Sequence, residues 1–132
     1  MYVGLLEDDT AIQEMLLLVL QDEGYGVTAY QDAEECIEAL IEVAQDSSAL
    51  VPVDLMIVDW RLSGPLSGIE VIQQLRAQPR LHSLPIILTT AATFSDSRVL
   101  QDLRVVLLEK PFSVDDMTAL VKQLIQAHLT AS

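Results

Sequence analysis

At 132 residues, 51% of them hydrophobic, the chain is long enough for one domain with a buried core. Its formal net charge of −13, from 20 acidic and 7 basic residues, would repel a phosphate backbone, so direct nucleic-acid binding is not expected. No apolar run is long enough for a membrane span, no signal-peptide pattern is present, and Cys36 is the only cysteine. We therefore expect a cytoplasmic protein without an internal disulfide or a membrane partner.

Short apolar runs alternate along the chain with stretches whose apolar residues recur at helical spacing. The apolar runs predict strands at residues 2–6, 27–30, 53–59, 84–90 and 105–108. The periodic stretches predict helices at residues 10–23, from 31 or 32 to 44, 68–78, 95–103 and 114–129, and Gly24 is the predicted stop of the first. This alternation predicts an α/β fold with a doubly wound parallel sheet of five strands. We expect one domain over residues 1–132, ordered from about 2 to 129, with no output domain in the chain.

Acidic residues stand where two of the predicted strands end, which is where such folds place their functional crevice. The first strand runs into Glu7, Asp8 and Asp9, and the third ends in Asp59. A solvated turn explains an acidic run by itself, and Asp9 suits the cap of the following helix. An acid that ends an apolar strand is costly to bury without a cation, however. Converging carboxylates favour a hard ion, so Glu7, Asp8 and Asp59 predict a Mg²⁺ (or Mn²⁺) site.

Two further polar residues end the fourth and fifth predicted strands, namely Thr90 and Lys110. Taken singly, each is ordinary: a strand-end hydroxyl and a solvated lysine. Beside a metal site, Lys110 would supply a second positive charge and Thr90 a hydrogen bond to phosphoryl oxygens. Asp59 would then attack phosphorus and form an aspartyl phosphate. The combination therefore predicts phosphoryl transfer.

Four sequence motifs together resemble those of the receiver domains of two-component response regulators, over nearly the whole chain. "GLLEDD" is similar to the acidic pair after the first strand of that family, "LMIVDWRL" to its phosphoacceptor strand, "PIILTTA" to its switch strand and "EKPF" to its Lys-Pro-Phe signature. The resemblance implies a flavodoxin-like, CheY-like fold with strand order 2-1-3-4-5.

The resemblance also implies a role for each matching residue. It maps the metal-binding acids to Glu7 and Asp8, with Glu7 acting through water. It makes Asp59 the phosphoacceptor and a metal ligand, and the backbone carbonyl of Arg61 a further ligand. The switch hydroxyl falls on Thr90 rather than Thr89, and Lys110 is the expected lysine, before a cis Lys110–Pro111 bond.

The function implied by the resemblance is signalling rather than enzymatic turnover. A sensor histidine kinase or a phosphotransfer protein would donate the phosphoryl group, and an effector outside this chain would respond. Self-phosphorylation and autodephosphorylation would be the only intrinsic reactions. A homodimer is left open.

Some positions depart from the family pattern. Ser63 replaces the usual proline after the phosphoacceptor, and the loop is one residue longer before Gly68. Leu107 replaces the usual switch aromatic, and only 20 residues separate Thr90 from Lys110. These departures predict intact phosphorylation chemistry with an atypical readout.

Three other kinds of protein share parts of this pattern. A receiver-like interaction module that never takes phosphate is the main one, although none of the chemical residues is missing. A flavin-binding protein of this fold would not place acids after its first strand. A dehalogenase-like phosphatase would have a second aspartate where this chain has Arg61.

Overall fold

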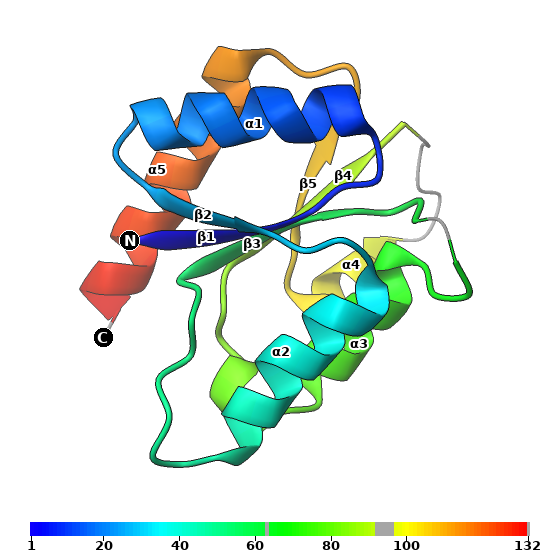
Figure 1. Cartoon of the computed structure of the whole chain (residues 1–132), viewed down its shortest axis with the longest axis vertical. Coiled ribbons are helices and arrows are strands. Elements are labelled where there is room, and N and C mark those ends of the chain that lie inside the picture. Colours follow the sequence, from blue (N-terminus) through cyan, green and yellow to red (C-terminus); the bar gives the residue numbers. More distant parts are fainter. Residues whose placement is uncertain (63, 92–96, 132) are drawn as a thin grey trace.

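The computed structural model describes residues 1–62, 64–91 and 97–131. Within these residues, five parallel strands form one sheet in the order β2-β1-β3-β4-β5, as the resemblance predicted (Figure 1). The strands are β1 (Tyr2–Leu6), β2 (Gly26–Ala29), β3 (Leu55–Asp59), β4 (Ile86–Thr90) and β5 (Val106–Glu109). The order places β3 at the centre of the sheet, between β1 and β4.

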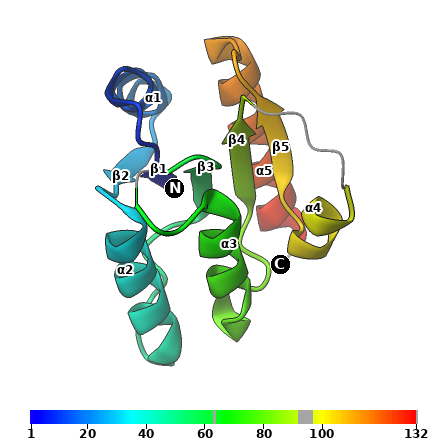
Figure 2. The same cartoon turned by 90° about the vertical axis from the view of Figure 1, so that its right-hand side faces the viewer.

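Helices cover both faces of the sheet (Figures 1 and 2). They are α1 (Thr10–Asp22), α2 (Ala33–Gln45), α3 (Gly68–Arg76), α4 (Ser97–Leu103) and α5 (Val114–Ala131). A short 3₁₀ turn, η1 (Pro79–Leu81), was not predicted. The predicted start of the fourth helix, at residues 95 and 96, lies outside the described residues. In the described part of the chain, no helix is both long and apolar enough to cross a membrane.

Local sequence explains where several helices begin and end. The Asp9 side chain caps α1 by accepting from the backbone amides of Ala11 and Ile12, at 2.9 and 3.2 Å. Asp32 caps α2 in the same way. After α1 the chain turns at Gly24, whose φ of +94° suits glycine, as its predicted role as a helix stop requires.

Strand alternation divides the core into two clusters, one on each face of the sheet. On the face covered by α1 and α5, the inward strand residues are Val3, Leu5, Leu55, Ile57 and Ile87. On the face covered by α2, α3 and α4, they are Leu6, Met56, Val58, Ile86 and Leu88. Side chains alternate between the two faces along a strand. The face of each polar side chain at a strand end therefore follows from the core residues before it.

Candidate functional site

Two carboxylic acids are buried side by side at the carboxyl ends of the central strands. Glu7 directly follows β1, and Asp59 is the last residue of β3. The strands pair with Leu6 opposite Val58, so the next residue of each strand lies beside that of the other. Glu7 is 4% exposed and Asp59 is 6% exposed. Both continue the strand positions that face α1 and α5.

Lys110 joins these two acids. Its Nζ lies 3.2 Å from Glu7 Oε1 and 3.3 Å from Asp59 Oδ1. The lysine is held by its own backbone amide, which donates to the Thr90 carbonyl at 2.7 Å. The predicted cis bond to Pro111 is present. One ammonium therefore faces two carboxyl groups, which leaves an excess of negative charge in a buried place.

The pKa of Glu7 is raised from its ordinary 4.5 to about 7, and burial is the main cause. The neighbouring Asp59 carboxyl group also raises it, while the Asp9 amide, at 3.1 Å from Oε1, and Lys110 lower it. Glu7 is therefore the acid of this pair that can hold a proton near neutral pH.

The donor set at this position fits a hard cation. Glu7 Oε2 is buried and has no hydrogen-bond partner among the described residues. When both acids are ionised, this oxygen-only site carries an excess of negative charge and suits Mg²⁺, which would compete with the proton on Glu7. Asp8 is exposed, and no three acidic, histidine or cysteine side chains gather as a metal cluster in the described part of the chain. The roles of Asp8 and of the Arg61 carbonyl stay predictions.

The fourth strand ends in two buried hydroxyls, Thr89 and Thr90, which are 0% and 2% exposed. Strand alternation places Thr90 with Leu88, on the side of α2, α3 and α4, at the same edge of the sheet. Thr89 is the register partner of Asp59. Sequence reasoning compared the two threonines only to place the switch hydroxyl, and gave Thr89 no role. The signal that could have found it is a hydroxyl in an otherwise apolar buried strand.

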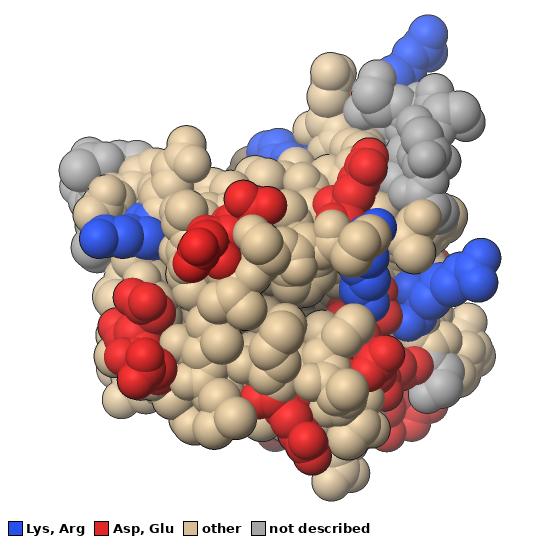
Figure 3. Space-filling model, turned by 90° about the horizontal axis from the view of Figure 1, so that it is seen from above, with Lys and Arg blue, Asp and Glu red and all other residues tan. Residues whose placement is uncertain are grey.

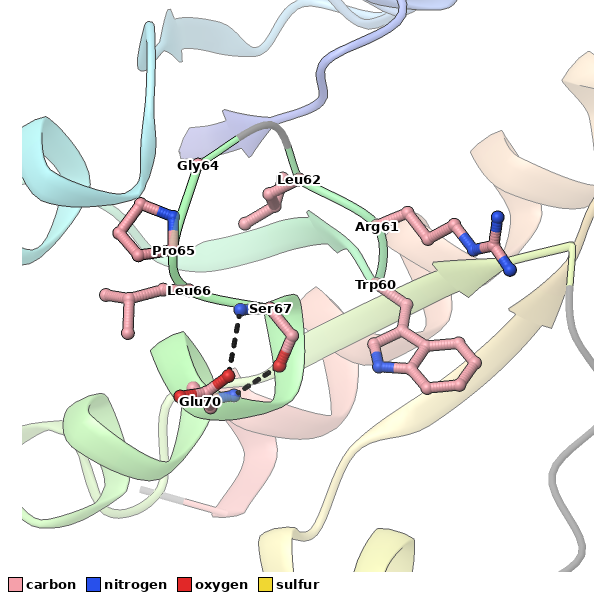
Figure 4. Close-up of a pocket in the computed structure, with 8 residues that line it drawn as sticks. All are labelled: Trp60, Arg61, Leu62, Gly64, Pro65, Leu66, Ser67 and Glu70. Atoms are coloured by element: carbon pink, nitrogen blue, oxygen red, sulfur yellow. Dashed lines mark hydrogen bonds between the residues drawn. The ribbon is translucent and has the colours of Figure 1, made fainter.

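The loop after Asp59 is closed tightly onto the strand. Gly68, the first residue of α3, donates its amide to the Trp60 carbonyl at 2.8 Å. A Cβ at Gly68 would lie 2.3 Å from the Asp59 carbonyl oxygen, so no other residue fits without movement. Ser67 and Glu70 form a capping box that begins α3 (Figure 4). The backbone that carries Asp59 is therefore held from both sides.

This loop also forms a groove of about 430 Å³, and neither Glu7 nor Asp59 is among the described residues that line it. Trp60 and Arg61 extend to one side of it, away from the capping box of Ser67 and Glu70 (Figure 4). Trp60 is half-buried and Arg61 is exposed. The only tryptophan of the chain thus stands next to the candidate phosphoacceptor, where its fluorescence can report changes.

The chain matches the family model of the response regulator receiver domain over residues 3–122. The chain belongs to this family. The chain is 33% identical over 129 residues to the phosphate regulon transcriptional regulatory protein PhoB of Rhizobium meliloti (strain 1021). The aligned region covers 94% of this chain and 52% of that protein. It is 28% identical over 127 residues to the transcriptional regulatory protein FixJ of Bradyrhizobium diazoefficiens, covering 95% and 57%. The chain thus spans about half the length of these curated relatives.

Solved structures show the same fold. A CheY-like receiver domain protein from Methanospirillum hungatei JF-1 superposes with a TM-score of 0.81 at 19% identity, over 99% of this chain and 98% of that one. The receiver domain of the sensor histidine kinase PA1611 from Pseudomonas aeruginosa PAO1 has a TM-score of 0.73 at 26% identity, over 95% and 97%. That structure is described with a magnesium ion coordinated in its active-site cleft. The protein is a signalling domain of two-component systems.

Proposed function

We propose that this receiver domain accepts a phosphoryl group on Asp59, from a histidine kinase or a phosphotransfer protein, in a reaction that needs Mg²⁺ (or Mn²⁺). The observation that carries the proposal is the position of Asp59. It ends the central strand, is 6% exposed, and has Lys110 Nζ at 3.3 Å from Oδ1. A nucleophile so placed can be reached only from beyond the strand ends, where a phosphoryl donor would dock.

In the proposed reaction, a carboxylate oxygen of Asp59 attacks phosphorus. The bond from phosphorus to the donor nitrogen breaks, and its electron pair stays on the donor imidazole. Lys110 offsets the charge of the phosphoryl oxygens, and Thr90 is proposed to donate a hydrogen bond to one of them. Mg²⁺, held by Glu7, Asp8, Asp59 and the Arg61 carbonyl, would supply further charge neutralisation.

Glu7 is the residue that couples this chemistry to protons. Its buried carboxyl group lies beside Asp59, and its pKa is raised to about 7. The proton on Glu7 and the metal compete for the same carboxyl oxygens. Below the raised pKa of Glu7, of about 7, metal binding and phosphorylation are therefore expected to weaken together.

The test compares Asp59→Asn with wild type in phosphorylation by acetyl phosphate, measured as acid-labile label per protein with and without Mg²⁺. Asp22→Asn, at the exposed end of α1, is a control that loses one carboxylate elsewhere. We expect label on wild type and on the control, only with Mg²⁺, and none on Asp59→Asn. Undiminished label on Asp59→Asn would refute the assignment. No label on any protein would favour the phosphorylation-independent interaction module.

Partners and location belong to the same proposal. Acidic side chains are spread over the face seen in Figure 3, and the net charge of −13 argues against direct contact with nucleic acid. The relatives PhoB and FixJ are transcriptional regulators about twice as long as the matched region. We therefore propose that residues 1–132 form a single receiver domain acting in the cytoplasm on an effector outside these residues. Its intrinsic chemistry would be limited to self-phosphorylation and autodephosphorylation, and a homodimer stays open.

A further inference from the structure

Arg76, the last residue of α3, joins three separate stretches of the chain. Its Nε and Nη1 donate to the carbonyls of Leu103 and Leu81, both at 2.8 Å, and its Nη2 donates to the Arg104 carbonyl at 3.2 Å. Leu103 ends α4, Arg104 follows it, and Leu81 ends η1. Burial lowers the pKa of Arg76 to about 10, so the group stays charged near neutral pH and its hydrogen bonds are charge-assisted. Arg76 therefore fastens the end of α4 to the end of α3.

The two residues between α4 and β5, Arg104 and Val105, form a strained turn, called here the α4–β5 turn. The Arg104 amide donates to the Gln101 carbonyl at 3.1 Å. The Val105 amide donates to the Leu100 carbonyl at 3.4 Å, which completes a Schellman cap. Arg104 has a φ of +56°, in the left-handed region where such caps usually carry glycine. Hydrogen bonds therefore hold this turn against local strain, and Arg76 supplies one of them despite carrying the same charge as Arg104.

The other end of α3 rests on the backbone of the proposed phosphoacceptor. The Gly68 amide donates to the Trp60 carbonyl at 2.8 Å. A Cβ at Gly68 would lie 2.3 Å from the Asp59 carbonyl oxygen and 2.9 Å from the Cα of Trp60. Because this contact leaves no free space, the peptide between Asp59 and Trp60 cannot shift toward α3 without moving Gly68.

The helix between these two contacts is short and continuous. Its nine residues span about 12 Å at a rise of 1.5 Å per residue. α3 and α4 lie side by side on one face of the sheet, where Val71 and Leu75 share a core cluster with Leu103 (Figure 2). Packed helices shift as rigid bodies by about 1–2 Å. A displacement at the first residue of α3 is thus delivered to the last one.

We propose that α3 is a strut that couples the phosphoacceptor backbone to the α4–β5 turn, with Arg76 as its positioning residue. The inference rests on the proposed function, because phosphorylation of Asp59 supplies the displacement. Without phosphate, Arg76 holds the turn closed. A shift of α3 by about 1–2 Å in any direction takes hydrogen bonds of this length out of their favourable range. The strained turn then opens more often, while Leu107 keeps its place.

The first test needs no phosphate. A methyl group at Gly68 pushes α3 away from the Asp59 carbonyl, so Gly68→Ala should speed amide exchange in the α4–β5 turn, measured by NMR, about threefold. Arg76→Met should speed it by at least as much, because the hydrogen bonds of the guanidinium are lost. The double variant should exchange no faster than Arg76→Met, because the connection is already broken. If the two effects instead multiply to within about twofold, the two ends of α3 act independently and the inference is wrong.

Two further variants separate the strut from a general effect of charge. Arg80→Met is the matched control, because Arg80 also donates to three backbone carbonyls, and none of them is in α4. Exchange in the α4–β5 turn of Arg80→Met should stay within about twofold of wild type. Arg76→Lys keeps the charge but cannot bridge three carbonyls with a rigid fork, so it should behave like Arg76→Met. Wild-type exchange in Arg76→Lys would contradict the proposed bridging role.

The second test uses beryllofluoride with Mg²⁺ as a phosphoryl mimic, and Trp60 fluorescence reports its binding. In wild type, the bound mimic should speed exchange in the α4–β5 turn about threefold, and in Arg76→Met it should add nothing. A turn that stays unchanged in wild type with the mimic bound would overturn the inference. If the mimic does not bind wild type, the proposed function fails, whereas the phosphate-free test still decides whether the strut exists.

Discussion

The proton held by buried Glu7 has a measurable effect on stability, which Glu7→Gln should remove. Glu7 is an acid whose pKa is raised on folding, from 4.5 to about 7. The folded protein therefore holds this proton more tightly than the unfolded chain. The stabilisation is fully present below pH 4.5 and is lost as the pH rises through about 7.

The size of this effect follows from the difference between the two pKa values. Each pKa unit corresponds to 1.36 kcal/mol, so a rise from 4.5 to about 7 corresponds to about 3 kcal/mol. The Glu7 side chain is fully buried, so solvent screens this effect little. Without metal, wild type should thus lose about 3 kcal/mol of unfolding free energy between pH 4.5 and pH 8 through this group alone.

The assay is urea unfolding between pH 4.5 and 8 with a chelator present. A glutamine at position 7 cannot titrate. Between pH 4.5 and pH 8, the free energy of unfolding of Glu7→Gln should therefore fall by about 3 kcal/mol less than that of wild type. Glu14→Gln, exposed on α1, removes the same charge without the burial and is the matched control. If Glu7→Gln and wild type lose equal stability over this range, the pKa of Glu7 is not raised by its burial in the folded protein.

Two further predictions concern the metal and the switch. Mg²⁺ should change the fluorescence of Trp60. In Asp8→Ala the Mg²⁺ affinity measured by this signal should be tenfold or more weaker, because a carboxylate ligand is lost. A titration curve equal to that of wild type would contradict the role of Asp8. Leu107 is half-buried against the core cluster of α2, α3 and α4, and it should stay there when beryllofluoride mimics the phosphate. Coupling to the surface of α4 and β5 should then be below the 1–3 kcal/mol or so typical of allostery. Structures with and without beryllofluoride decide this, and a rotamer flip of Leu107 with α4 displaced as a unit would show that coupling survives without an aromatic.

Local patterns in the sequence predicted the elements of this fold well. Short apolar runs located the strands, and apolar residues at helical spacing located the helices, to within a few residues. A strand buried on both faces is apolar throughout, and a helix buried along one side repeats its apolar residues every turn. Asp9 and Gly24 were recognisable as the cap and the stop of α1, since their roles depend only on adjacent backbone. The strand order came from the resemblance to receiver domains, since the same local periods are compatible with other orders.

The geometry of the site depended on contacts between distant segments. Glu7 and Lys110 are 103 residues apart in sequence and 3.2 Å apart in space, and only the pairing of β1, β3, β4 and β5 makes that contact. The same pairing buries Glu7 while Asp8, the next residue, is exposed. A shift of the strand register by one residue would exchange which of two adjacent residues is buried, and sequence alone does not reveal the register.

Thr89 illustrates the same limit. From the sequence alone, the residues at the strand ends, Glu7, Asp59, Thr90 and Lys110, could be selected because their side chains carry charge or a matching motif. Thr89 matched no motif, and its buried position level with Asp59 follows from the pairing of β3 and β4, whose register partners here are 30 residues apart in the chain. The sequence by itself determined which chemical groups reach the edge of the sheet. The tertiary structure decided which of them face one another, because that depends on strand register and burial.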